Sequence, residues 1–280
     1  MDKKVLQTRT LTGIVFGAIM LAGLLINQTG FMILTTLICA GCLWEYYAMV
    51  SAVQTYSEGK KIRTRIFYFV VGMAVYLFFM LNPFSFFVRI YLTVLLFPIL
   101  FLLFAVELFL IDKRNFQNIT INIFGLIYIV TPLSLLHHIL TFNESWFPGM
   151  INPIVGIVLL IWTNDTFAYL TGAQFGKHKM FPEVSPKKSW EGFVGGTIMT
   201  LVVAWLLSMW LTSMSLRDWI ALALIASIIG TIGDLFESMI KRNLGIKDSG
   251  NIMPGHGGFL DRFDAFIFCI PFVFAYLMLK

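Results

Sequence analysis

Long apolar segments recur along this chain, and they constrain its fold more than any other feature of the sequence. A helix that crosses the hydrocarbon core of a bilayer, which is about 30 Å thick, needs about 20 mostly apolar residues. About nine segments approach that length, and they lie at residues 11–28, 31–50, 66–82, 88–110, 119–141, 153–173, 192–212, 218–236 and 260–279. The sequence therefore predicts an all-α integral membrane protein with about nine transmembrane helices.

The composition supports a membrane protein that forms one domain. Hydrophobic residues make up 58% of the chain and charged residues 12%, whereas soluble domains contain about 45–50% and about 25%. The longest polar stretches, 174–191 and 237–259, are too short to bury a core of their own. We expect a single polytopic domain over residues 1–280, in which 1–150 supply scaffold spans and 151–280 carry the polar motifs.

Basic residues are distributed unevenly between the two sides of this predicted bundle. With alternating spans, 17 of the 20 Lys and Arg residues fall on one side, and only Arg89, Arg217 and Lys280 fall on the other. The positive-inside rule makes the rich side cytoplasmic, so we expect a cytoplasmic N-terminus. The same bias explains the net charge of +5 without a nucleic-acid partner. The start of the chain lacks an Arg- and Ser-rich transit pattern, which favours the cytoplasmic (inner) membrane of a bacterium.

A few carboxylates lie where a bilayer makes them costly. Asp165 falls inside the sixth segment, Asp234 ends the eighth with Glu237 one turn later, and Asp261 and Asp264 begin the last. A carboxylate at the bilayer centre costs about 2.5–3.5 kcal/mol on insertion scales, so such groups normally face a polar cavity. Carboxylate oxygens without nearby His or Cys clusters suit Mg²⁺, which usually takes one or two carboxylates together with substrate phosphates. These acids therefore predict a magnesium site at the cytoplasmic interface.

Cations and glycines surround the same acids. The basic residues there could neutralise phosphate groups, and they are Lys187, Lys188, Lys241, Arg242 and Lys247. In the alternative reading, the acids form internal salt bridges with Lys241, Arg242 or Arg262. The Gly-rich turn Pro254–Gly258 allows backbone N–H groups to approach an anion, although glycines are equally expected in a plain tight turn. His256 could contact phosphate, transfer a proton or serve a structural role.

The residues alone thus indicate Mg²⁺-assisted phosphoryl or nucleotidyl transfer to a lipid substrate. A more specific signal lies in the C-terminal part of the chain. The segments GDLFESMIKR (233–242), GIKDSG (245–250) and PGHGGFLDRFD (254–264) together resemble the signature of the phosphatidate cytidylyltransferase family. Two further segments, NDTFAY (164–169) and SPKKSWEG (185–192), and the pair Trp44-Glu45 also look like family sequence.

This resemblance implies a reaction, a cofactor and partners. The phosphate of phosphatidic acid would attack the α-phosphorus of CTP with the help of Mg²⁺, giving CDP-diacylglycerol and pyrophosphate. The number of metal ions stays open, with a second cation as one alternative. Besides CTP and phosphatidic acid, the implied partners are membrane lipids and a second copy of the chain in a homodimer.

The resemblance also implies roles for individual residues. Asp234 and Asp261 would be the first metal ligands, with Asp264 and Asp165 next. The catalytic set would be Asp234, Asp261, Lys241, Arg242, Lys187 and Lys188. The substrate-binding set would be Ser185, Ser189, Ser238, Lys247, Asp248, His256, Gly257, Gly258 and Arg262. Two positions depart from the usual family pattern: Ser189 stands where Thr is more frequent, and Phe167 stands where smaller residues are common.

Two other functions compete with this interpretation. A related nucleotidyltransferase acting on another lipid phosphate would carry similar polar motifs, because lipid tails are recognised by apolar surface. An ion-coupled transporter could use Asp165 and Asp234 as ion sites. Against transport, the charged residues crowd one face of the membrane, and the sequence has no inverted pair of interrupted helices.

Overall fold

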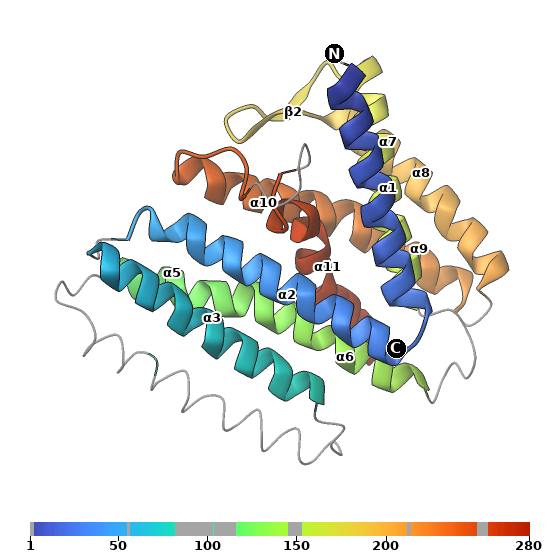
Figure 1. The fold of residues 1–280 in the computed structure, drawn as a ribbon. Helices are drawn as coiled ribbons and strands as arrows, with labels where there is room; N and C mark the ends of the chain where they lie inside the picture. The colour runs from blue at the N-terminus through green and yellow to red at the C-terminus, as the bar shows by residue number, and fades with distance from the viewer. Residues whose placement is uncertain are drawn as a thin grey trace.

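The computed structural model describes residues 3–54, 57–81, 103, 116–144, 153–211, 214–250 and 257–280. This part of the chain consists of helices and one short hairpin (Figure 1). The helices of the first half are α1 (Lys3–Leu25), α2 (Gln28–Ser51), α3 (Glu58–Leu81), α5 (Phe116–Gly125), the π-helical turn η1 (Leu126–Val130) and α6 (Thr131–Glu144). The second half contains α7 (Pro153–Phe175), β1 (Lys179–Phe181), β2 (Ser185–Ser189), α8 (Trp190–Trp210), α9 (Leu216–Leu224), η2 (Ile225–Ile229), α10 (Gly230–Asn243) and α11 (Leu260–Leu279).

Seven helices of the described chain are long and apolar enough to cross a membrane. They correspond to seven of the predicted segments, because α5, η1 and α6 form one span and α9, η2 and α10 another. The first predicted segment is helical in α1, where the described apolar stretch, Thr12–Leu25, is shorter. The fourth, 88–110, lies outside the described residues except for position 103. The chain is thus a helical, multi-pass membrane protein.

The structure adds two details to the prediction. The helix that contains the eighth segment continues past residue 236 to Asn243 and carries Glu237 and Lys241 within it. A polar helical end can extend into the interfacial region, where hydropathy no longer marks its limit. Within the polar stretch 174–191, β1 and β2 pair as an antiparallel hairpin.

The helices form two groups with α10 and α11 between them. Figure 1 shows α2, α3, α5 and α6 side by side on one flank, and α7, α8 and α1 on the other. Helix α11 packs against both α6 and α10 and also contacts α2 and α7. The α10–α11 pair therefore contacts helices from both halves of the chain.

Close contact between α7 and α8 depends on small residues. A Cβ at Gly196 in α8 would lie 2.9 Å from the carbonyl oxygen of Asn164 in α7. Small residues at such positions let helix backbones approach closely in membranes. The contact fixes the helix that carries Asp165 against the helix that follows the hairpin.

A buried polar trio lies in the first group of helices. The Tyr76 hydroxyl lies 2.8 Å from Thr35 Oγ1 and 2.9 Å from His137 Nε2. All three side chains are buried, and polar groups removed from water need such partners. The trio joins α2, α3 and α6 without contributing to the pocket described below.

Candidate functional site

One cavity of about 1360 Å³ joins α1, α7, α8, the hairpin, α10 and α11. Its polar wall contains the four aspartates that the sequence predicts as metal ligands, together with several cations. These lining residues are Asp165, Asp234, Asp261, Asp264, Lys187, Lys188, Lys241, Arg262 and Ser189. Residues about 100 positions apart in sequence thus meet in one place, as the motif analysis requires.

Apolar side chains also line this cavity. Helix α1 contributes Val15, Phe16 and Ile19, and α7 and α8 contribute Trp162 and Phe193. A cavity lined by both charged and apolar side chains suits a ligand with a charged head and an apolar tail.

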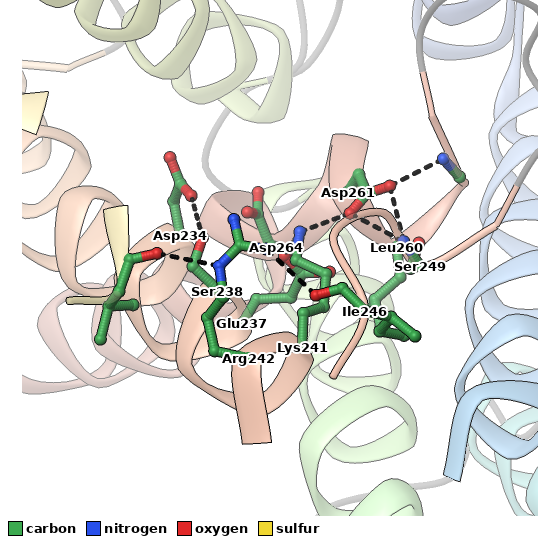
Figure 2. A network of polar contacts seen from close by, with 12 residues as sticks. Asp234, Glu237, Ser238, Lys241, Arg242, Ile246, Ser249, Leu260, Asp261 and Asp264 are labelled. Carbon is green, nitrogen blue, oxygen red and sulfur yellow. Dashed lines mark hydrogen bonds and ion pairs between the residues drawn. The ribbon is translucent and has the colours of Figure 1, made fainter. Parts of the chain in front are cut away.

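Asp261 is held in place by a cation and by two backbone groups (Figure 2). Lys241 Nζ donates to Asp261 Oδ1 at 2.5 Å and also pairs with Glu237. The backbone N–H groups of Ser249 and Gly258 donate to Asp261 Oδ2 at 3.0 Å and 2.8 Å. The alternative of an internal salt bridge therefore applies to Lys241, whose amine is shared by two carboxylates. Contact between Lys241 and phosphate stays a prediction.

Asp234 faces the hairpin from α10. Lys188 Nζ lies 2.7 Å from Asp234 Oδ2, and the Ser238 hydroxyl donates to Asp234 Oδ1 at 3.3 Å. Both side chains of the ion pair are partly exposed to the cavity. Asp264 is more deeply buried and accepts the N–H of Ala265 at 2.6 Å.

The hairpin presents two lysines on a strand instead of on an open loop. Lys187 and Lys188 lie in β2, which leads directly into α8. The Ser189 side chain caps α8 by accepting the N–H of Gly192 at 3.2 Å. Glu191 accepts the N–H groups of Lys177 and His178, both at 3.1 Å, and so ties the end of α7 to the start of α8.

Arg242 connects the hairpin to the loop after α10. Its Nε donates to the Val184 carbonyl at 3.3 Å, and its Nη1 donates to the Ile246 carbonyl at 3.1 Å (Figure 2). Several predicted site residues are absent from the described lining of the cavity, namely Ser185, Ser238, Arg242, Lys247, Asp248, Gly257 and Gly258. His256 lies outside the described residues.

Glu45 is a polar residue of the site region to which motif reasoning gave no role. It lies in α2, and its carboxylate accepts from the Ser249 hydroxyl and the Leu260 N–H, both at 3.0 Å. The signal that could have identified it is an acid in the middle of an apolar segment.

The pocket chemistry fits Mg²⁺. The four aspartates offer oxygen ligands, and Mg²⁺ usually needs only one or two carboxylates because substrate phosphates and water complete its shell. Within the described ranges, no three His, Cys, Asp or Glu side chains are close enough together to form a complete protein cage. Such oxygen donors fit a metal whose remaining ligands are substrate phosphates and water.

Fold and pocket first define a class: a multi-pass membrane protein with a pocket lined by carboxylates, cations and apolar side chains. The chain matches the model of the Cytidylyltransferase family over residues 7–280, and it belongs to that family. The family resemblance seen in the C-terminal motifs is thereby confirmed.

Curated relatives carry a more specific name. The phosphatidate cytidylyltransferase of Staphylococcus aureus (strain COL) is 50% identical over 115 residues, which are 40% of this chain and 44% of the relative. That of Staphylococcus haemolyticus (strain JCSC1435) is 49% identical over 115 residues with the same coverage. That of Bacillus subtilis (strain 168) is 47% identical over 124 residues, or 43% of this chain and 45% of the relative. The matched region thus spans less than half of each of these relatives.

Proposed function

We propose that this protein transfers the cytidylyl group of CTP to phosphatidic acid, giving CDP-diacylglycerol and pyrophosphate. The observation that carries the proposal is the cavity that four aspartates and several lysines line together with apolar side chains. Membership in the cytidylyltransferase family supports CTP as the nucleotide substrate. The names of the relatives support phosphatidic acid as the lipid substrate.

The reaction needs charge neutralisation and alignment more than proton transfer. A phosphate oxygen of phosphatidic acid forms a bond to the α-phosphorus of CTP, while the bond from that phosphorus to the oxygen that bridges the α- and β-phosphates breaks, and pyrophosphate leaves with that oxygen. The attacking phosphate is already anionic at neutral pH, so no strong general base is required. Lys187 and Lys188, presented by β2, would offset charge on the phosphates. Asp261 would keep its orientation because Lys241 and two backbone N–H groups hold it.

Mg²⁺ is the proposed cofactor, held by Asp234 and Asp261 with Asp264 and Asp165 nearby in the same cavity. When bound, it would neutralise phosphate charge as a Lewis acid. Either one ion or a pair of cations agrees with this set of oxygen ligands.

The proposed setting is the cytoplasmic face of a bacterial inner membrane, with about nine spans and a cytoplasmic N-terminus. The bias of 17 of 20 basic residues to one side supports this orientation. Figure 1 places the N-terminus near the hairpin that carries Lys187 and Lys188, in agreement with one shared face. A homodimer is the proposed assembly, as the family resemblance implies.

The test is pyrophosphate release by the purified protein in detergent, supplied with CTP, Mg²⁺ and dioleoyl phosphatidic acid. We expect release only when all three are present, and little release when ATP, GTP or UTP replaces CTP. Release with a different lipid phosphate alone would instead favour a related nucleotidyltransferase. No release with any lipid phosphate, from protein shown to be folded, would contradict the proposal and make ion transport the next hypothesis to test.

A further inference from the structure

Glu45 is a buried carboxylate in the first half of the chain, and the hydrogen-bond partners described for it lie in the second half. Its side chain is 3% exposed in the middle of α2. The contacts described for it are those from the Ser249 hydroxyl and the Leu260 N–H, which are 204 and 215 positions away in the sequence. Burying a carboxylate among helices is costly, so these contacts have to offset a substantial loss of hydration.

Two described glycines between α10 and α11 lie close to this carboxylate. A Cβ atom added to Gly250 or Gly258 would collide with the carboxylate of Glu45. A larger residue at either position would therefore force the Glu45 side chain to shift.

Glu45 also supplies the start of α11 with an acceptor. The first N–H groups of a helix lack partners within the helix, and Phe259 at the N-cap position makes no side-chain cap. Glu45 accepts the N–H of Leu260, the first residue of α11, immediately before Asp261. A negative charge at this end also interacts favourably with the helix dipole.

Two residues beside Glu45 also hold Asp261. Ser249 donates its hydroxyl to Glu45 and its backbone N–H to Asp261. Gly258, where an added Cβ would collide with Glu45, donates its N–H to Asp261. Glu45 itself is absent from the described lining of the cavity, so it would act on the site through Ser249 and Gly258 and not by contact with the substrate.

We propose that Glu45 is a positioning residue that anchors Ser249 and the start of α11 and thereby sets the orientation of Asp261 in the cavity. The proposal rests on the proposed cytidylyl transfer for its kinetic readout. Its structural readout, amide exchange in the loop, does not depend on any activity. A result against the positioning role of Glu45 can therefore be told apart from a result against the proposed cytidylyl transfer.

The experiment compares Glu45→Leu with Glu45→Gln, which keeps one neutral acceptor oxygen at a similar reach. We expect kcat to fall about 100-fold in Glu45→Leu and about tenfold in Glu45→Gln, because a misplacement of about 1 Å at a catalytic group can cost that much. The KM for CTP should change less than about threefold, since Glu45 does not line the cavity. Hydrogen exchange at the amides of Ser249 and Leu260 should rise in the same order.

The control is Tyr76→Phe, which removes a buried hydrogen bond between α3 and α2 at a residue outside the described lining of the cavity. It should leave both kcat and loop exchange unchanged. If Glu45→Leu does not fold, Ser249→Ala carries the test, with an expected loss in kcat of at least about threefold and faster exchange in the loop. Unchanged exchange at Ser249 and Leu260 in folded Glu45 variants would overturn the proposal, as would a loss of kcat in Tyr76→Phe equal to that in Glu45→Leu.

Discussion

At the scale of single residues, a small number of charge pairs decides which side chains face the cavity. Lys241 is shared between Glu237 and Asp261, so its charge is largely matched before any substrate binds. Lys188 instead pairs with Asp234 at the open side of α10, where both side chains remain partly exposed. The sequence could place all these residues in one region, but it could not show which cation faces which carboxylate, because that depends on how α10 meets the hairpin and α11.

Asp261 provides the prediction at this scale. Asp261→Asn keeps the size of the side chain and one acceptor oxygen but removes the charge that faces Lys241 and the cavity. We expect turnover to fall more than tenfold, a rise in barrier of over about 1.4 kcal/mol, in protein that is still folded and inserted. The measurement is the rate of pyrophosphate release at saturating CTP and lipid.

A matched control is Asp218→Asn. Asp218 is also a buried carboxylate paired with a lysine, Lys280, but it does not line the cavity. This variant should keep near-normal turnover per folded molecule, even if its thermal stability falls. Equal losses of turnover in both variants would indicate that removal of any buried charge disables the protein, and would argue against a special role for Asp261.

At the scale of elements, the apolar helices were predictable and the hairpin was not. A run of about 20 apolar residues has few other ways to fold, so α2, α7, α8 and α11 were found within a few residues of their ends. The segment 179–189 is polar, short and interrupted by two prolines, and its strands pair only with each other. The hairpin is held by hydrogen bonds with Glu191 at the start of α8 and Arg242 on α10. Hydrophobic periodicity in the sequence does not predict such contacts.

The contact between α7 and α8 gives a prediction about stability. Gly196→Ala places a methyl group 2.9 Å from the carbonyl oxygen of Asn164, so the two helices must move apart. We expect a loss of about 1–3 kcal/mol, typical of an overpacked contact, seen as a lower midpoint of thermal unfolding in detergent. Gly59→Ala is the control, because a Cβ there meets nothing within 4 Å. An equal or higher midpoint for Gly196→Ala would show that this helix contact tolerates the methyl group.

At the scale of the whole molecule, the bias of basic residues predicts an orientation that labelling can test. Glu58→Cys lies at the exposed start of α3, on the side expected to be cytoplasmic, and Arg217→Cys is exposed at the start of α9 on the opposite side. We expect a membrane-impermeant maleimide to label Arg217→Cys in intact cells and Glu58→Cys only after the membrane is opened. The native thiols, Cys39, Cys42 and Cys269, are buried and should give little background. The reverse labelling pattern would invert the topology and move the cavity to the outer face.

The contact between Glu45 and the loop before α11 also bears on how the protein is made. Its partners Ser249 and Leu260 lie 204 and 215 positions after Glu45, so they leave the ribosome long after α2 has done so. During most of synthesis α2 therefore carries an acid whose partners have not yet been made. The contacts around Asp261 can form only after α11 has been made. A nascent chain stalled before α11 would contain membrane spans but would lack the complete candidate site.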